Sequence, residues 1–177
     1  MGGGGSGGYI KATINVIPGL TTGAISLAAG GLAGAAGASG GNAGASTFTY
    51  NGITYTANGG FGATYTLPIV SANVRVGGAG AAISSSTGAD AYVLGSGSPG
   101  GRGIASVANN TADGSGGNTS LGGGGLGTIC VVCGTAVTGP TATANSGSGG
   151  AGACNGAGVA ATGGAGAIGQ VFIREYR

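Results

Sequence analysis

Glycine recurs at every third position from Gly31 to Gly40, in the run Gly-Leu-Ala-Gly-Ala-Ala-Gly-Ala-Ser-Gly. A period of three fits neither the α-helix, with about 3.6 residues per turn, nor the strand, with a period of about two. It fits the left-handed polyproline-II helix, which has about three residues per turn and no internal hydrogen bonds. One side of such a rod is bare backbone, and its N–H and C=O groups need partners on neighbouring rods when buried. The repeat therefore predicts glycine-faced rods that pack together, and the spacing returns at Gly163, Gly166 and Gly169.

A flexible linker is the first alternative for a chain with 48 glycines among its 177 residues. Disordered chains usually combine low hydrophobicity with high net charge. This chain has a mean hydropathy of +0.38 and a net charge of only +2. An ordered state is favoured. Because large side chains are few, that state must depend on a dense network of backbone hydrogen bonds or on assembly with other chains. The repeat is too short, and the prolines lie too far outside it, for collagen.

Short strands are predicted on both sides of the glycine repeat. Period-two alternation over residues 9–16 predicts a strand, and Pro18-Gly19 then predicts a turn to a returning strand over residues 24–28. Asn51-Gly52 lies between two runs rich in threonine and aromatic residues, which is the strongest short signal for a β-hairpin. Weaker strand candidates are residues 64–67 and 73–76.

We expect a single glycine-rich domain that is mainly β and irregular, without α-helix. Residues 1–76 supply the hairpins and the first rod, and residues 77–169 supply a bundle, or sandwich, of polyglycine and polyproline-II rods with end loops. Residues 170–177 form a closing strand that pairs with the N-terminal hairpin in a small antiparallel sheet. Whether residues 1–8 are a linker or part of the fold stays open at this point.

Side chains suited to catalysis are scarce. Histidine is absent, and the carboxylates Asp90, Asp113 and Glu175 lie far apart in the sequence. The single lysine lies outside any Gly-Lys-Ser/Thr motif, so a phosphate-binding loop is not predicted. The scattered charges form no basic patch for nucleic acid. The sequence thus indicates no enzyme, no cofactor and no metal.

Cys130, Cys133 and Cys154 form the one cluster of reactive side chains. A zinc site needs a fourth ligand, and a thioredoxin-like motif needs a βαβ unit that is not predicted here. We interpret the cysteines as small buried residues or as a bridged pair with one left over. A disulfide that matters for the rim of the bundle, and metal or redox chemistry, are the alternatives.

Tyr92, Val93 and Leu94 lie in a segment rich in glycine and serine. On a turn at the end of a rod bundle, apolar residues have no evident core to fill. They predict either a local plug over the rod ends or a contact patch for a partner, since tyrosine offers a large contact area at low entropic cost.

The chain combines a strand, a Pro-Gly turn, a second strand, a glycine rod and a Thr-Phe-Thr-Tyr hairpin. Ala-Asn-Gly-Gly, further glycine tracts and a terminal Val-Phe-Ile-Arg-Glu-Tyr follow. This order resembles the glycine-rich C-terminal domains of tailed-phage tail fibres and related fibre-tip adhesins, whose polyglycine-II helices stack into a sandwich. Residues 7–60 and 170–177 match best. Relatives usually carry another strand before the first glycine tract, and a partner chain is one way to complete the sheet.

The resemblance implies a non-enzymatic virion protein that acts outside the host cell, and no signal peptide is predicted. Loops at the distal end of the bundle would bind a host surface receptor, either an outer-membrane protein or a surface glycan. By position these loops are residues 83–99, 106–118 and 129–145. The candidate contacts are Tyr92, Val93, Leu94, Arg102, Asn109, Asn110, Val131 and Val132. Other fibre or virion proteins are further expected partners, and a homotrimer is one expected assembly.

Two other functions fit the same composition. A fibre spacer or capsid decoration would use the rod bundle only as a stiff module. Ice-binding proteins also contain flat glycine-rich rod bundles, but they usually need regular threonine or alanine on one face, and the threonines here are irregular.

Overall fold

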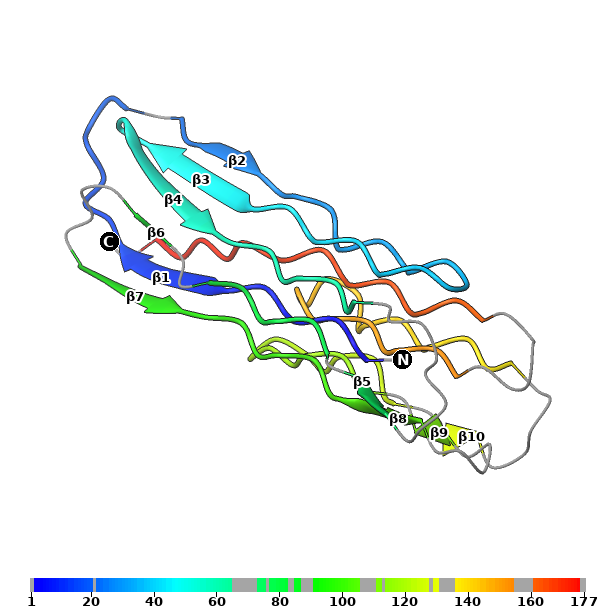
Figure 1. The fold of residues 1–177 in the computed structure, drawn as a ribbon. Coiled ribbons are helices and arrows are strands. Elements are labelled where there is room, and N and C mark those ends of the chain that lie inside the picture. The colour runs from blue at the N-terminus through cyan, green and yellow to red at the C-terminus, as the bar shows by residue number, and fades with distance from the viewer. Residues whose placement is uncertain are drawn as a thin grey trace.

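Extended rods run along most of the molecule, and short strands lie at its two ends (Figure 1). The structure is a computed structural model that describes residues 2–20, 22–64, 73–75, 77–82, 85–86, 91–105, 111–112, 114–127, 129–130, 136–154 and 161–175. The strands are β1 (Tyr9–Thr13), β2 (Ala24–Ser26), β3 (Ser46–Tyr50), β4 (Ile53–Ala57), β5 (Asn73–Arg75), β6 (Ser85–Ser86), β7 (Ala91–Gly95), β8 (Gly103–Ala105), β9 (Thr111–Ala112) and β10 (Ile129–Cys130). Within the described residues there is no helix, and the predicted class, mainly β and irregular, is confirmed.

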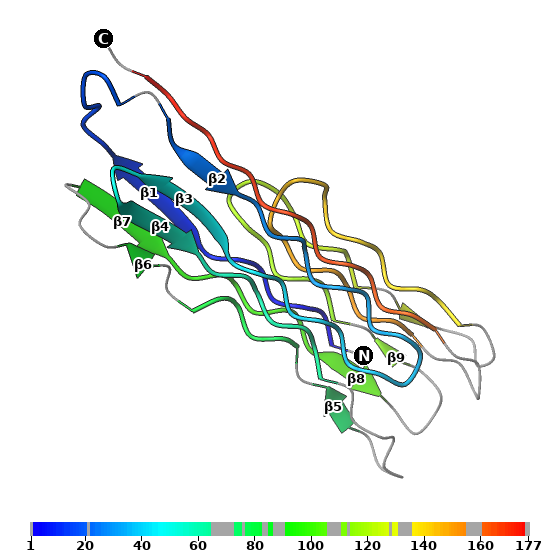
Figure 2. The same ribbon diagram turned by 90° about the horizontal axis from the view of Figure 1, so that it is seen from above.

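The strands form small antiparallel sheets that mark the two ends of the rod bundle. One end holds the pair β1-β7 and the sheet β2-β3-β4-β6, and we call it the sheet end. The opposite end holds the sheet β10-β9-β8-β5, and we call it the loop end (Figures 1 and 2). Rods connect the two ends, so the chain crosses the molecule repeatedly.

The rod formed by residues 2–8 lies inside the bundle and donates hydrogen bonds with a period of three. The amides of Gly3 and Ser6 donate to one rod, through the carbonyls of Gly101 and Ser98, at 3.1 and 2.9 Å. The amides of Gly4 and Gly7 donate to a second rod, through the carbonyls of Gly150 and Gly147. The amides of Gly5 and Gly8 donate to a third segment, through the carbonyls of Phe61 and Asn58. Successive amides therefore point to different neighbours, as a rod with about three residues per turn requires. Residues 2–8 are part of the core rather than a flexible linker.

A second internal rod, residues 146–153, continues this network. Its amides at Gly149 and Gly152 donate to the carbonyls of Gly117 and Gly114, and Ala151 donates to Pro140. Ser6, Ser146 and Ser148 are buried in the two internal rods and satisfy their own hydroxyls, as where Ser146 donates to Thr143 at 2.6 Å. Glycine, alanine and serine residues thus form the centre of the two internal rods, where the close spacing of the backbones leaves no room for larger side chains.

Glycine is required wherever two rods touch through their backbones. A Cβ atom added at Gly149 would overlap the carbonyl oxygen of Gly4, and one added at Gly97 would overlap that of Ser6. Neither contact could be relieved by rotating a side chain, because backbone atoms lie on both sides. The close approach is what allows each amide to reach a carbonyl on the next rod.

The Gly31–Gly40 repeat is not one continuous rod, as predicted, but a rod, a turn and the start of another rod. Gly31 and Gly34 accept hydrogen bonds from the rod of residues 161–169, through Gly166 and Gly163. The chain then reverses at Gly37, whose φ of 74° is in the left-handed region that favours glycine. The spacing is confirmed at both contacts, but it does not reveal where the rod ends.

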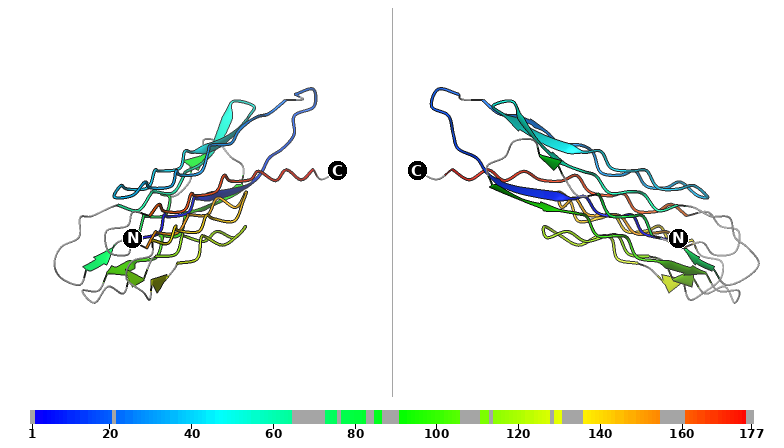
Figure 3. Two further views of the ribbon diagram at one scale, coloured as in Figure 1. Left: turned by 90° about the vertical axis from the view of Figure 1, so that its right-hand side faces the viewer. Right: turned by 60° about the vertical axis from the view of Figure 1, so that its left-hand side comes forward.

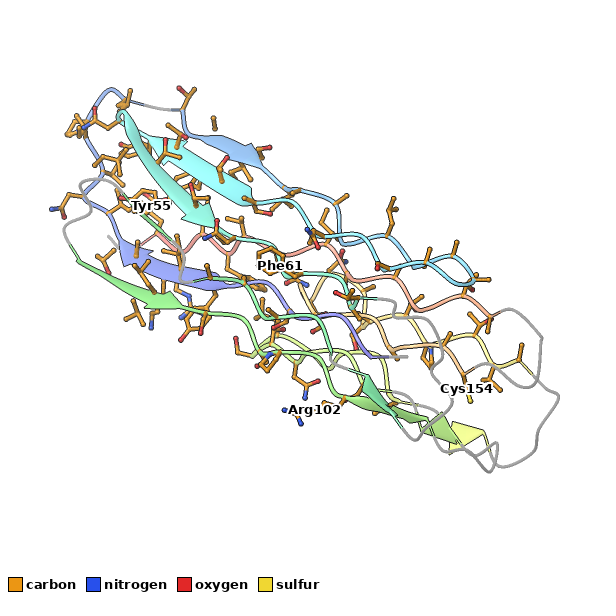
Figure 4. All side chains as sticks on the ribbon, viewed as in Figure 1. Tyr55, Phe61, Arg102 and Cys154 are labelled. Atoms are coloured by element: carbon orange, nitrogen blue, oxygen red, sulfur yellow. The ribbon has the colours of Figure 1, made fainter. Side chains whose placement is uncertain are left out.

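The Asn-Gly hairpin forms as predicted. Asn51 and Gly52 have φ values of 47° and 72° between β3 and β4, as a type I′ turn requires. Phe48 and Tyr55 stack across the strands with ring centroids 5.9 Å apart, and Tyr55 is the largest buried side chain among the described residues (Figure 4). The aromatic residues of the hairpin are packing residues.

Two predicted strand pairings are wrong. β1 pairs with β7, with Tyr9 opposite Gly95, and the returning strand β2 pairs instead with β3. Tyr50 holds the intervening loop in this position, because its hydroxyl accepts from the amide of Ile17 and donates to the carbonyl of Leu20. The predicted closing strand is also absent, since residues 170–175 are extended without strand pairing and residues 176–177 lie outside the described part. Of the weaker candidates, β5 forms within 73–76, and most of 64–67 lies outside the described residues.

We predict that Gly149→Ala lowers the free energy of unfolding by about 1–3 kcal/mol, because a methyl group there must push two rods apart. The matched control is Gly169→Ala, where an added Cβ meets no atom within 4 Å. That variant should be neutral or more stable by up to about 1 kcal/mol, through reduced entropy of the unfolded chain. Denaturant unfolding measures both. Equal effects of the two substitutions would contradict a backbone-packed lattice.

Candidate functional site

The loop end collects the ends of several rods in one small sheet. β8 pairs with both β5 and β9, and β10 continues the sheet beyond β9 (Figure 1). Each strand has only two or three residues, because the chain changes there from rod to connection. The sheet therefore anchors the segments that join the rods at this end.

Two arginines occupy adjacent positions in the register of this sheet. Arg102 immediately precedes β8, and its exposed side chain points away from the bundle (Figure 4). Arg75 ends β5, and its Cα lies opposite Gly103, the neighbour of Arg102. Our sequence reasoning named Arg102 but missed Arg75, because only strand register shows that residues 27 positions apart become neighbours. The sequence signal that could have identified Arg75 was its position within the weak strand candidate of residues 73–76.

The remaining candidates for the loop end belong to its connections. Asn109 and Asn110 lie between β8 and β9, and Val131 and Val132 directly follow β10. All four lie outside the described residues, so their contacts stay a prediction. The flanking strands join these two connections to one sheet.

Tyr92, Val93 and Leu94 lie at the sheet end, away from the other candidates. The prediction of a turn there is wrong, because these residues form β7 and Tyr92 pairs with Ala12 of β1. The period-two content of Tyr-Val-Leu is too short to be recognised among glycine and serine. The structure thus divides the predicted contacts between two ends of the molecule.

The predicted end loops are shorter than expected. Residues 83–99 include β6, β7 and the start of a rod, and residues 114–118 continue the lattice. Residues 136–143 also run as a rod, in which Pro140 accepts a hydrogen bond from Ala151, and the chain turns at residues 144–145. Residues 136–143 bond to several neighbouring segments, through Gly139 to Thr162, Ala142 to Ala165 and Thr143 to Gly123. Glycine spacing does not reveal this rod, because Gly139 is the only glycine in residues 136–143.

Cys154 takes part in a disulfide bond and is 0 % exposed. It ends the second internal rod, where its amide and carbonyl pair with Val137 at 3.0 Å (Figure 4). Cys130 belongs to β10, whereas Cys133 lies outside the described residues. The disulfide therefore links the internal rod to another segment of the chain close to the loop end.

The described residues contain neither a cluster of metal ligands nor a membrane-spanning helix. No group of three or more Cys, Asp or Glu side chains is placed to hold a metal ion among the residues that the structure describes. In the same residues, no helix has the length and apolar character needed to cross a membrane.

Rods joined by backbone hydrogen bonds, with glycine at most internal contacts, define this molecule as a glycine-rich rod-lattice protein. The chain belongs to the glycine-rich domain family, whose model matches residues 1–176. No curated protein and no solved structure matches it.

We predict that breaking the disulfide destabilises the protein. Cys154 closes a loop of 21 or 24 residues, depending on whether its partner is Cys133 or Cys130, and chain-entropy arguments give about 3 kcal/mol for such a loop. Reductant should lower the Tm of the wild type, and Cys154→Ala should lower it by a similar amount. The variant's Tm should then be insensitive to reductant. Unchanged Tm values in all of these samples would contradict a stabilising role.

Proposed function

We propose that the protein is the receptor-binding tip of a phage tail fibre, with the loop end as its contact surface. Membership of the glycine-rich domain family and the rod lattice support a scaffold role. The assignment of the protein to a phage tail fibre rests on the resemblance described above. The proposal implies that the protein acts outside the host cell and has no catalytic centre.

The observation that carries the proposal is the convergence of rod connections on the sheet β10-β9-β8-β5. A stiff lattice that anchors both ends of a connection lowers the entropy that the connection loses on binding. Recognition loops on rigid scaffolds depend on the same effect. The short strands at the loop end fix where the connections that carry Asn109, Asn110, Val131 and Val132 leave the sheet.

Arg75 and Arg102 favour a receptor with anionic groups. The register of β5 and β8 places Arg75 opposite Gly103, the residue after Arg102, so both positive charges belong to the loop end. Guanidinium groups bind phosphate and carboxylate through paired hydrogen bonds, which lysine cannot reproduce. Among the surface receptors considered, this favours a glycan with phosphate or carboxylate substituents over an uncharged one.

The test incubates host cells with purified protein in excess and then measures adsorption of the phage that carries it. We expect adsorption to fall at least about tenfold, because the protein at saturating concentration occupies the receptors. Arg75→Ala/Arg102→Ala should block at least about tenfold less well, and the residual block should depend less on salt.

Lys11→Ala is the control variant, since it removes a positive charge from β1 at the sheet end. It should block as well as the wild type. A spacer or decoration protein would leave adsorption unchanged even at saturating concentration, and that result would refute the proposed function. Equal losses in the Lys11 and arginine variants would place the contact elsewhere than at the loop end.

A further inference from the structure

The C-terminal segment, residues 170–174, leaves the lattice at the sheet end. The last lattice bonds of its rod are those of Ala167, which donates to Ser148, and Ile168, which accepts from Gly147. At Gly169 an added Cβ would meet no atom within 4 Å, so the lattice is already open on one side of the chain there. Figures 2 and 3 show the segment extending beyond the bundle.

This segment has the composition of a strand but no strand partner within the described residues. Its sequence is Gln-Val-Phe-Ile-Arg, and β-branched and aromatic residues favour paired, half-buried strands. Phe172 and Ile173 are instead 75 % and 69 % exposed. An extended backbone with free N–H and C=O groups is a template for pairing with another strand.

The order of residues in the segment is symmetric about Phe172. On either side stand β-branched residues, Val171 and Ile173, and beyond them polar ones, Gln170 and Arg174. In an antiparallel pair of two copies centred on Phe172, each Val171 faces an Ile173. Each Gln170 faces an Arg174, and the two phenylalanines face each other. Aliphatic and aromatic cross-strand pairs of this kind stabilise sheets.

We propose that residues 170–174 pair antiparallel with the same residues of a second copy, forming a two-fold symmetric dimer at the sheet end. The same patch then serves both copies, as a closed two-fold interface requires. No like charges lie directly opposite each other in this register. The proposal does not depend on receptor binding at the loop end.

Neighbouring registers fit less well. Moving the centre to between Phe172 and Ile173 would place Arg174 opposite Val171, and a centre at Ile173 would place Arg174 opposite Phe172. A shift by one residue also exchanges the faces on which side chains lie. The symmetric register alone pairs apolar with apolar and polar with polar throughout.

Other apolar side chains are exposed at the same end of the molecule. They include Ile25 and Leu27, in and directly after β2. A two-stranded pair alone is only marginally stable in water. We therefore expect a reversible dimer whose population rises with protein concentration, rather than a permanent one.

Cysteine cross-linking tests the register directly. Directly opposite residues in an antiparallel pair have Cα atoms about 4.5–5.5 Å apart, which is within the range of a disulfide bond. Cα atoms of residues that are two positions out of register are too far apart for such a bond. Phe172→Cys should give a covalent dimer on mild oxidation. Val171→Cys alone and Ile173→Cys alone should not, but a mixture of the two should. Wild-type protein, oxidised in parallel, measures any cross-linking through the native cysteines.

Sedimentation of the reduced proteins tests the surface without cross-linking. Wild type should dimerise with increasing concentration, and Ile173→Lys should weaken dimerisation at least about tenfold, because it introduces a charge into the pair. The matched control is Leu126→Lys, at a side chain that is 79 % exposed on a rod; it should dimerise like the wild type. A wild type that stays monomeric, or cross-linking at Val171 alone as strong as at Phe172, would overturn the proposal.

Discussion

The absence of Cβ atoms at the contacts between rods is the constraint on which this structure depends. Without side chains in the way, the backbones approach closely enough for amides and carbonyls on separate rods to bond at 2.7–3.1 Å, as between Gly78 and Gly3 or Gly3 and Gly101. Each such bond satisfies a backbone group that would otherwise be buried and unpaired, which is costly. The lattice therefore takes the place that large apolar side chains have in ordinary cores.

This arrangement explains the composition of the chain. Glycine loses more backbone entropy on folding than other residues, so a glycine-rich chain folds only if many backbone bonds form together. The period of three directs those bonds to several neighbours at once, as residues 2–8 show. Large side chains are then confined to the margins, where Phe48 and Tyr55 pack in the sheet β2-β3-β4-β6. Serine enters the interior only where its hydroxyl finds a carbonyl, as at Ser146.

Local signals in the sequence predicted local structure well. The Asn51-Gly52 turn and the contacts of Gly31 and Gly34 follow from backbone preferences that act within a few residues. Partners far along the chain could not be derived, because β1 offers the same alternating face to β2 or to β7. The rod of residues 136–143 was also missed, since Gly139 is its only glycine. For the candidate site, Arg102 was named from its position through the family resemblance, whereas the place of Arg75 in the same sheet depends on the register of β5 and β8.

Residue-resolved amide hydrogen exchange tests the lattice most directly. The amides of Gly4, Gly5 and Gly7 donate to two different rods inside the bundle, so they should open only when the whole domain unfolds. We expect their exchange to be slowed at least about 1,000-fold relative to an unfolded chain, as for the core of an ordinary stable domain. Exchange of these glycines at the unprotected rate, in a protein whose Asn51-Gly52 hairpin remains formed, would contradict the account.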